Sequence, residues 1–376
     1  MWLWQEPDFP NFTWNEADIL KIIAEIRYQQ GLLLGRIQDV GFEEKGSAII
    51  EAQTQNVINS ALIENEHLSL SDVRSSIARH LGFQKDYQKA DRKTEGMVEM
   101  LLDATDQSDK PLTKQRLFGW HNALFPDGFS GIHAITVAQW REEYADPMQV
   151  VSGMGDRLRV HFEAPPASRV ESMMQQFFDW AENEALEALD PIIKSGIAHL
   201  WFLTIHPFED GNGRIARAIS DAFLSQSDGV KQRFYNLSSQ IQKDKKNYYK
   251  RLQMQQRGDL DITPWLTWYL NAVELALKSA NHNLNQILFK SQLWQKINNQ
   301  QSVNERQKII INLMLSADFK GNINTSKYAK LCKCSPDTAL RDINQLKKRG
   351  ILIKNPENKG RNTSYFLTNS WELIDK

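Results

Sequence analysis

The stretch that decides the fold reads His206-Pro207-Phe208-Glu209-Asp210-Gly211-Asn212-Gly213-Arg214-Ile215-Ala216-Arg217. It joins two segments whose composition is typical of buried helices. Residues 200–205 before it are mostly apolar, and Pro207 disfavours helical geometry at His206, so we expect the first helix to end there. After the turn, apolar residues recur at helical spacing over 215–223, which predicts a second buried helix that begins near Asn212.

The start of this second helix has the features of an anion-binding site. Gly211 and Gly213 permit backbone angles that other residues avoid, and they leave room for a ligand beside the main chain. A helix start also presents free N–H groups and the positive end of its dipole. Arg214 and Arg217 share one face of the first turn. Cations at a helix start are unfavourable because they oppose the helix dipole, so their presence there indicates a bound phosphate between them.

Two other residues of the stretch supply groups for chemistry. Asp210 offers the hard oxygen ligand that Mg²⁺ prefers, and Mg²⁺ is commonly bound by one or two carboxylates together with substrate phosphates. His206, with an ordinary pKa of about 6.5, is suited to act as a general base. The alternative is a helix–loop–helix turn that carries these charges incidentally.

The whole stretch matches the motif H-P-F-x-D/E-G-N-G-R-x-x-R, and on it the chain resembles Fic-domain proteins. The resemblance implies a mainly helical Fic fold that transfers AMP from ATP, with Mg²⁺, to a Ser, Thr or Tyr hydroxyl of a protein, including the enzyme itself. It implies His206 as the catalytic base and Asp210 as the metal ligand. The ATP-binding residues that it implies are Glu64, His206, Gly211, Asn212, Gly213, Arg214, Ile215, Ala216, Arg217 and Tyr249.

A second motif of the family, S/T-x-x-x-E-G/N, matches Ser60 to Asn65 in a predicted helix over 46–66. Ser60 and Glu64 are four residues apart and share one helix face, which taken alone is typical of a solvated surface. The position ahead of the core resembles the class with an N-terminal inhibitory helix. That class implies that Glu64 pairs with Arg217 and replaces a γ-phosphate oxygen, so that ATP binds in a geometry unsuited to transfer.

Residues 150–162 carry the clearest alternation of apolar and polar residues, with glycines between two halves, which predicts a β-hairpin. In Fic proteins a hairpin at this place forms a flap that docks the target protein by main-chain pairing. A plain surface hairpin is the alternative. The family also places an adenine-facing residue after the motif helix, and spacing from His206 favours Tyr249, although Tyr248 and Tyr249 would equally suit a core.

Composition limits the class of protein. The chain has 376 residues, a formal net charge of −1 and ordinary apolar content, as expected for a soluble protein of two or three domains. The two cysteines, Cys332 and Cys334, fit a reducing compartment and are too few for a structural zinc site. We expect no signal peptide and no membrane span, and therefore a cytoplasmic protein.

The C-terminal segment differs in charge from the rest. Residues 304–376 hold 14 Lys and Arg against 7 Asp and Glu, a net charge of +7. Three short predicted helices and a hairpin there resemble a winged helix-turn-helix, with Thr338, Arg341 and Lys348 near the exposed face of the third helix. This favours duplex DNA as a partner. A protein-docking or dimerising module of the same fold is the alternative, and a homodimer stays open.

The sequence thus predicts four segments: an N-terminal helical region with the inhibitory helix (1–105), a Fic core with a hairpin flap (106–272), a helical linker (273–303) and a winged helix-turn-helix domain (304–376). The favoured function is a self-inhibited protein adenylyltransferase. Two alternatives remain: a DNA-binding regulator whose core senses a nucleotide, and a Fic enzyme that uses another nucleotide or removes AMP.

Overall fold

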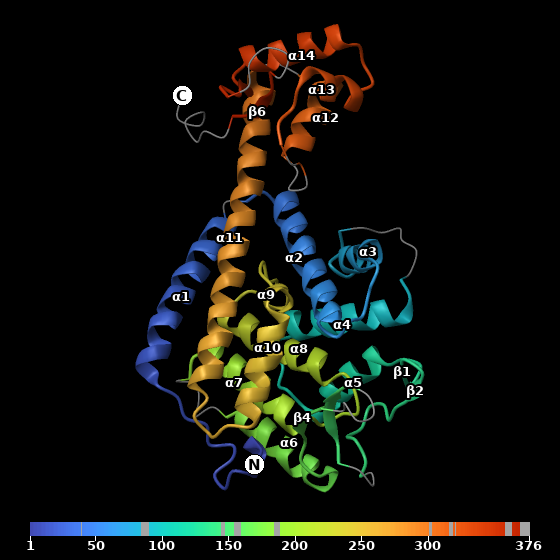
Figure 1. The fold of residues 1–376 in the computed structure, drawn as a ribbon, viewed down its shortest axis with the longest axis vertical. Helices are drawn as coiled ribbons and strands as arrows, with labels where there is room; N and C mark the ends of the chain where they lie inside the picture. Colours follow the sequence, from blue (N-terminus) through green and yellow to red (C-terminus); the bar gives the residue numbers. More distant parts are fainter. Residues whose placement is uncertain are drawn as a thin grey trace. The chain divides into compact units, whose positions relative to one another are not determined.

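The computed structural model describes residues 1–38, 40–83, 90–143, 147–153, 159–183, 189–300, 303–315, 319, 321–357 and 363–368. Over these residues the chain is mainly helical, with fourteen α-helices and three two-stranded antiparallel hairpins (Figure 1). The prediction of a mainly helical fold is confirmed. No helix among the described residues combines the length and the apolar character needed to cross a membrane.

The chain divides into two compact units, Met1–Leu284 and Asn285–Lys376. The division falls within the long helix α11 (Thr263–Gln300), in the stretch that the sequence predicts as a separate linker. This division into two compact units does not test the four segments predicted from the sequence, and their bounds stay a prediction.

The N-terminal part of the first unit is built from four helices. A 3-10 helix, η1 (Leu3–Gln5), precedes them and is fixed by a hydrogen bond of 2.8 Å from the Trp4 indole to the Glu163 carbonyl. The four helices are α1 (Glu16–Gln38), α2 (Phe42–Ile63), α3 (Leu70–His80) and α4 (Arg92–Asp106).

The remaining helices of the first unit surround a central pair. That pair is α7 (Pro191–Ile205), which is buried along nearly its whole length, and α8 (Asn212–Asp228), which packs against it. The Asp190 carboxylate caps α7 by accepting from the Ile192 N–H at 2.8 Å. The others are α5 (Lys114–Leu124), α6 (Ala167–Ala181), α9 (Leu237–Lys243), α10 (Lys245–Gln256) and most of α11.

Two of the hairpins belong to this unit. One pairs β1 (Phe129–Ser130) with β2 (His133–Ala134), and the other pairs β3 (Gln149–Ser152) with β4 (Arg159–Glu163). The second is the hairpin predicted over 150–162, of which residues 154–158 lie outside the described residues.

A buried polar network ties α1 and α2 to α8. The Arg233 guanidinium pairs with the Asp221 carboxylate, and both side chains are 1% exposed. The Asn56 amide of α2 donates to the other Asp221 oxygen at 2.8 Å, and the Gln30 amide of α1 donates to Asp228 at 2.5 Å. Because buried polar groups must be paired, these contacts fix the N-terminal helices on the core.

The second unit has its own apolar core. Its elements are α12 (Glu305–Met314), α13 (Thr325–Leu331), α14 (Pro336–Lys348), β5 (Leu352–Lys354) and β6 (Tyr365–Leu367), with residues 358–362 between the strands outside the described range. Leu293 and Ile297 of α11 belong to this core, so the apolar cluster begins before residue 304.

The contact of α4 with α5 gives a test of the packing. A Cβ added at Gly96 would lie 1.8 Å from the Ala123 carbonyl oxygen, whereas one added at Gly119 of α5 meets nothing within 4 Å. We therefore expect Gly96→Ala to lower the free energy of unfolding by about 1–3 kcal/mol, because two backbones must separate. The control Gly119→Ala should be neutral or stabilising by up to about 1 kcal/mol, since alanine favours a helix. Urea denaturation of both variants compares them, and equal midpoints would contradict this packing.

Candidate active site

The loop between α7 and α8 is shaped by two left-handed residues. His206 ends α7 at φ 52° and ψ 58°, and Gly211 precedes α8 at φ 83°. A Cβ atom at Gly211 would also lie 2.9 Å from the Phe125 ring, so both the backbone angle and the lack of space require glycine here. The helix end and the helix start predicted on either side of the loop lie where the sequence placed them.

The Asn212 side chain closes the loop on itself. Its Oδ1 accepts from the Phe208 N–H at 3.0 Å, and its Nδ2 donates to the Phe208 carbonyl at 2.8 Å. Phe208 is fully buried and its ring stacks on His121 with centroids 4.2 Å apart. Asn212 is thus occupied with the loop, whereas the sequence assigned its side chain to the phosphates.

His206 has the tautomer of a base. Its Nδ1 lies 3.4 Å from the Leu203 carbonyl, which can only accept, so Nδ1 carries the proton and Nε2 is free to accept one. Burial, and next the charge of Arg141, lower the pKa of His206 to about 4, against opposing effects of the Leu203 carbonyl, Asp210 and Glu64. The imidazole is therefore neutral at physiological pH.

Asp210 is held as an ionised carboxylate. Burial raises its pKa, but the charge of Arg214 and hydrogen bonds from Ser130 and the Gly211 N–H together keep that pKa below the ordinary value. Its side chain is 42% exposed, so oxygen lone pairs remain open to a ligand. A hard, ionised and partly solvated oxygen donor beside an anion site suits Mg²⁺.

His121 fixes the main chain of Asp210. The Ala138 N–H, which can only donate, lies 3.2 Å from His121 Nδ1, so Nε2 carries the proton and donates to the Asp210 carbonyl at 3.2 Å. Burial lowers the pKa of His121 to about 4, which keeps this neutral tautomer. Besides stacking on Phe208, His121 thus positions the main chain of the loop.

Another group with metal-ligand chemistry lies elsewhere in the first unit. One ligand atom each of His80, Glu95 and Glu99 lies within 4.8 Å of the others. The Glu95 carboxylate, however, already accepts from Arg79 and from Ser76. This cluster is therefore a paired surface network.

Both motif arginines are paired with carboxylates from the end of α2. Arg217 is 1% exposed; its Nη1 donates to Glu64 Oε1 at 2.8 Å, and its Nε and Nη2 donate to the hydroxyl and carbonyl of Ser60 at 2.9 and 2.8 Å. Arg214 Nη1 donates to both oxygens of Glu66 at 2.9 Å. Within the described residues, the buried Nε of Arg214 has no partner.

The Glu64 carboxylate lies against the start of α8. A Cβ built on Gly213 would come 2.2 Å from Glu64 Oε1, so only glycine permits this approach. Despite burial, Glu64 raises the pKa of Arg217 above its ordinary value. A carboxylate of the chain thus lies at the place where the sequence predicts bound phosphate.

The C-terminal carbonyls of α2 are also capped by the core. Besides Ser60, the Ile63 carbonyl accepts from the Tyr249 hydroxyl at 3.1 Å, and the Leu62 carbonyl accepts from Lys245 at 3.3 Å. Lys245 also donates to the Asn65 side chain at 2.8 Å, and Asn65 has φ 59°. Ser60, Glu64 and Asn65 are therefore all engaged with α8 and α10.

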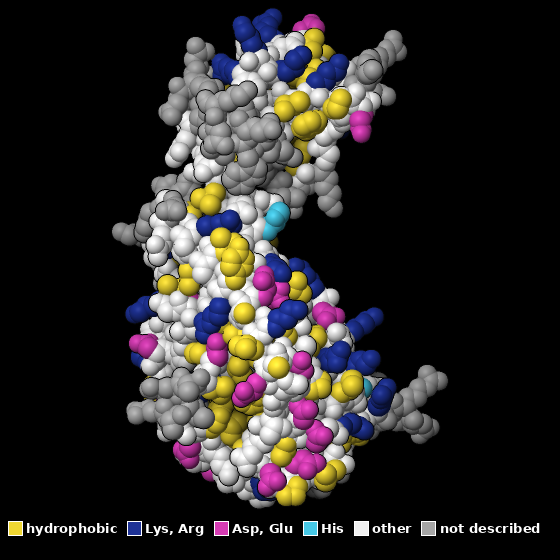
Figure 2. Space-filling model, turned by 90° about the vertical axis from the view of Figure 1, so that its left-hand side faces the viewer, with side chains coloured by type: hydrophobic (Ala, Val, Ile, Leu, Met, Phe, Trp, Pro, Cys, Tyr) yellow, Lys and Arg dark blue, Asp and Glu magenta, His cyan; other side chains and the backbone are white. Residues whose placement is uncertain are grey.

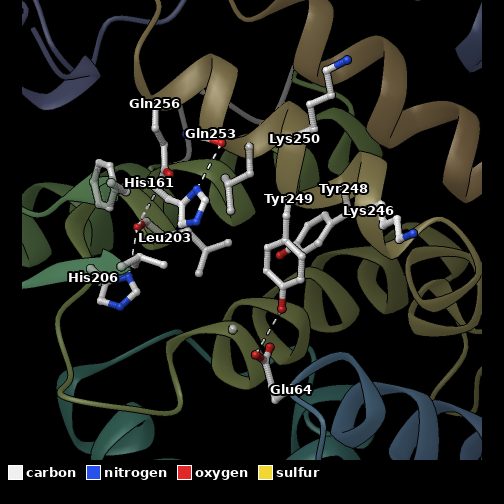
Figure 3. A pocket seen from close by; sticks show the side chains of 14 residues that line it. Glu64, His161, Leu203, His206, Lys246, Tyr248, Tyr249, Lys250, Gln253 and Gln256 are labelled. Atoms are coloured by element: carbon white, nitrogen blue, oxygen red, sulfur yellow. Dashed lines mark hydrogen bonds between the residues drawn. The ribbon is translucent and has the colours of Figure 1, made fainter. Parts of the chain in front are cut away.

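A pocket of about 450 Å³ opens beside His206 and Glu64 (Figure 3). Side chains from β4, α10 and the motif loop point into it, and the Tyr249 hydroxyl lies 3.3 Å from Glu64 Oε2. Both tyrosines line the pocket, but Tyr248 is buried and bonded to His199 at 2.9 Å, whereas Tyr249 is exposed. The lining residues are Glu64, Val150, His161, Phe162, Leu203, His206, Gly213, Lys246, Tyr248, Tyr249, Lys250, Leu252, Gln253 and Gln256.

Two of the predicted ATP-binding residues have side chains that cannot reach a ligand. Ile215 and Ala216 are fully buried, and the Ile215 N–H donates to the Gly211 carbonyl at 3.0 Å. Sequence reasoning missed Ser130, Arg141 and Glu66. Of these three, only Glu66 could have been suspected from the sequence, because it directly follows the second motif, which ends at Asn65.

Comparisons with known proteins show which families and proteins this chain is similar to. Residues 111–224 match the Fic/DOC family, and residues 2–83 match a domain of unknown function, DUF4172. The chain is 25% identical over 228 residues to a protein adenylyltransferase Fic of Nematostella vectensis, which covers 60% of this chain and 48% of that protein. It is 35% identical over 80 residues to a probable protein adenylyltransferase of Aquifex aeolicus, covering 21% of this chain and 24% of that protein. The chain thus spans about half the length or less of these curated relatives.

A solved structure supports the fold over nearly the whole chain. A Fic family protein from Desulfovibrio desulfuricans is similar with a TM-score of 0.52 and 20% identity, over 95% of this chain and 97% of that one. A signalling protein with a Fic domain from Bacteroides thetaiotaomicron gives 0.50 and 18% identity, over 71% and 97%. Residues 111–224, which match the Fic/DOC family model, thus contain the complete motif on the α7–α8 loop, and the fold is similar to that of solved Fic proteins.

Proposed function

We propose that this protein is an adenylyltransferase that transfers AMP from ATP to a hydroxyl of a protein. The observation that carries the proposal is the free Nε2 of a neutral His206 beside a pocket that meets the arginine-flanked start of α8. Similarity of parts of this chain to proteins named adenylyltransferases supports the proposal.

The chemistry follows from the positions of the groups. Nε2 of His206 would take the proton of the target hydroxyl as its oxygen attacks the α-phosphorus. The bond between the α-phosphorus and the bridging oxygen breaks, and pyrophosphate leaves. N–H groups at the start of α8, with Arg214 and Arg217, would stabilise the phosphate charges. Mg²⁺ at Asp210, when bound, would neutralise further phosphate charge.

The β3–β4 hairpin is the proposed docking site of the target. Val150 of β3 and Phe162 of β4 line the pocket, so the hairpin borders the reacting centre. Arg257 donates to the main-chain carbonyls of Val160 and His161, so these two carbonyls of β4 already have a partner. A two-stranded hairpin with a free edge can accept an extended segment by main-chain pairing, which suits varied target sequences.

We also propose that the described conformation is self-inhibited. Glu64 pairs with Arg217 at 2.8 Å and lies against Gly213, where a phosphate would need both groups. A well-desolvated Arg–carboxylate pair is strong, and removing one partner frees the other. The chain therefore competes with its own substrate.

For the catalytic base, we expect His206→Ala to reduce AMP transfer by ~10²–10⁴-fold, the usual effect of losing a positioned base. ATP affinity should be nearly unchanged, because Arg214, Arg217 and the α8 start remain. Transfer of labelled AMP and calorimetric ATP titration measure the two quantities. Full activity of the variant would contradict the mechanism and leave a nucleotide-sensing role for the core.

For the inhibitory contact, we expect Glu64→Gln and Glu64→Gly both to raise the rate of AMP transfer by about 10-fold or more. A tenfold rise requires that loss of the Glu64–Arg217 pair favour ATP binding by only about 1.4 kcal/mol. Gln keeps the shape and removes the charge, whereas Gly also loosens the end of α2 by up to about 1 kcal/mol. Intact-mass analysis with Mg²⁺ and each nucleotide reports modification, including self-modification. If neither variant exceeds the wild type, Glu64 is not an inhibitor.

DNA binding by the second unit is a further candidate. We propose it because α13 and α14 are followed by the β5–β6 hairpin, the order of a winged helix-turn-helix, and Arg341, Asn344 and Lys348 are exposed on α14. On the face shown in Figure 2, the part formed by α12–α14 shows more Lys and Arg than Asp and Glu.

The full chain should bind duplex DNA with an affinity that falls steeply between about 50 mM and about 200 mM salt, since counterions are released. Lys348→Ala should lower the slope of log affinity against log salt by about 1, whereas Lys21→Ala on α1, the control, should not. Gel-shift titrations compare the three proteins. Absence of binding at the lowest salt would favour a protein-docking module.

A further inference from the structure

An irregular segment, residues 135–143 between β2 and β3, lies along the motif loop. The Thr136 N–H donates to the Glu209 carboxylate at 3.2 Å, and the Trp140 ring packs on Phe208 with centroids 5.1 Å apart. The Arg141 N–H donates to the Pro207 carbonyl at 2.9 Å. The segment therefore contacts three successive residues of the loop, Pro207, Phe208 and Glu209.

Arg141 makes the most specific of these contacts. Its Nε donates to the His206 carbonyl at 2.8 Å, and its Nη2 donates to the Pro165 carbonyl at 2.5 Å. The side chain is only 6% exposed, and burial lowers its pKa from the ordinary value with Glu143 opposing. A buried guanidinium bound to carbonyls is retained only where its planar donors meet fixed acceptors.

The contact matters because of the backbone of His206. A non-glycine residue in the left-handed region, such as His206 at φ 52°, is strained and persists only where its surroundings determine it. Asn212 fixes the loop from Phe208 onward, but the His206 carbonyl itself is bound by Arg141. Arg141 also links this carbonyl to Pro165, two residues after the end of β4.

We propose that Arg141 is a positioning residue of the transfer reaction, which holds the His206–Pro207 turn to the end of the flap strand so that Nε2 of His206 faces the pocket. The inference rests on the proposed function for its kinetic consequence. Its structural part, that Arg141 fixes the state of His206, can be measured without any turnover.

The electrostatic surroundings of His206 support a spectroscopic test. The charged groups that act on it are Arg141 from the segment, Asp210 from its own loop and Glu64 from α2. His161 of β4 and Lys246 and Lys250 of α10 line the same pocket. Removing Arg141 deletes the nearest cation that opposes protonation, so the midpoint of His206 should move upward.

The test uses the full chain, with Arg116 as the control arginine. The Arg116 guanidinium is half-buried and binds the main-chain carbonyls of Asp103, Gln107 and Lys110 as well as the Asp103 carboxylate, and none of these partners belongs to the motif loop. The imidazole resonance of His206, assigned with His206→Ala, is followed by NMR against pH in the nucleotide-free protein. We expect a higher midpoint in Arg141→Gln, a smaller change in Arg141→Lys and none in Arg116→Gln.

The same substitutions in a Glu64→Gly background give the kinetic readout. Arg141→Gln should reduce AMP transfer by up to ~10²-fold, because a displacement of about 1 Å at a reacting group has that effect. ATP affinity should stay unchanged, Arg141→Lys should restore part of the rate, and Arg116→Gln should match the parent. If the parent transfers no AMP, the proposed function fails, and the NMR result alone decides the role of Arg141.

An unchanged His206 resonance in Arg141→Gln would overturn the proposal whatever the rates. Equal rates for Arg141→Gln and Arg116→Gln in an active parent would also overturn it, because Arg141 would then be an ordinary buried cation.

Discussion

The arrangement of the first unit depends on a buried cation. Arg217 lies in the core between α2 and α8 with almost no exposed surface, and a guanidinium there requires charged or carbonyl partners. In the described conformation Ser60 and Glu64 supply them. The position of α2, the state of the anion site and the shape of the pocket all follow from how this one requirement is met.

The loop that carries the chemistry is fixed by a second constraint, the pairing of buried main-chain groups. Phe208 is bonded to Asn212, Asp210 to His121, and His206 to Arg141, so few atoms of the loop rely on water. Side chains from three separate parts of the chain thereby hold a stretch that contains two left-handed residues. The precision needed for a base and a metal ligand comes from this redundancy.

Local patterns predicted the loop well, because glycine angles, a proline turn and helical spacing act over a few residues. Glu64 and Arg217, 153 residues apart, were joined only through a resemblance, and spacing would not have paired them. Arg141 was missed because its acceptors are main-chain carbonyls, which have no sequence signature. Helix α1 continues through Gly31 and Gly35, which local propensity disfavours, because burial of one helix face outweighs the weak helix propensity of glycine.

The capping of α2 by the core has a consequence for the modular history of the chain. The family similarities divide the chain into an N-terminal domain (2–83) and a Fic domain (111–224), yet the last turn of α2 obtains its caps from Arg217, Lys245 and Tyr249. A recombination that exchanged one domain alone would leave carbonyls and cations without partners on both sides. The two segments match different family models, but the end of α2 depends on Arg217 within the second segment and on Lys245 and Tyr249 after it, so we expect residues at this contact to change together.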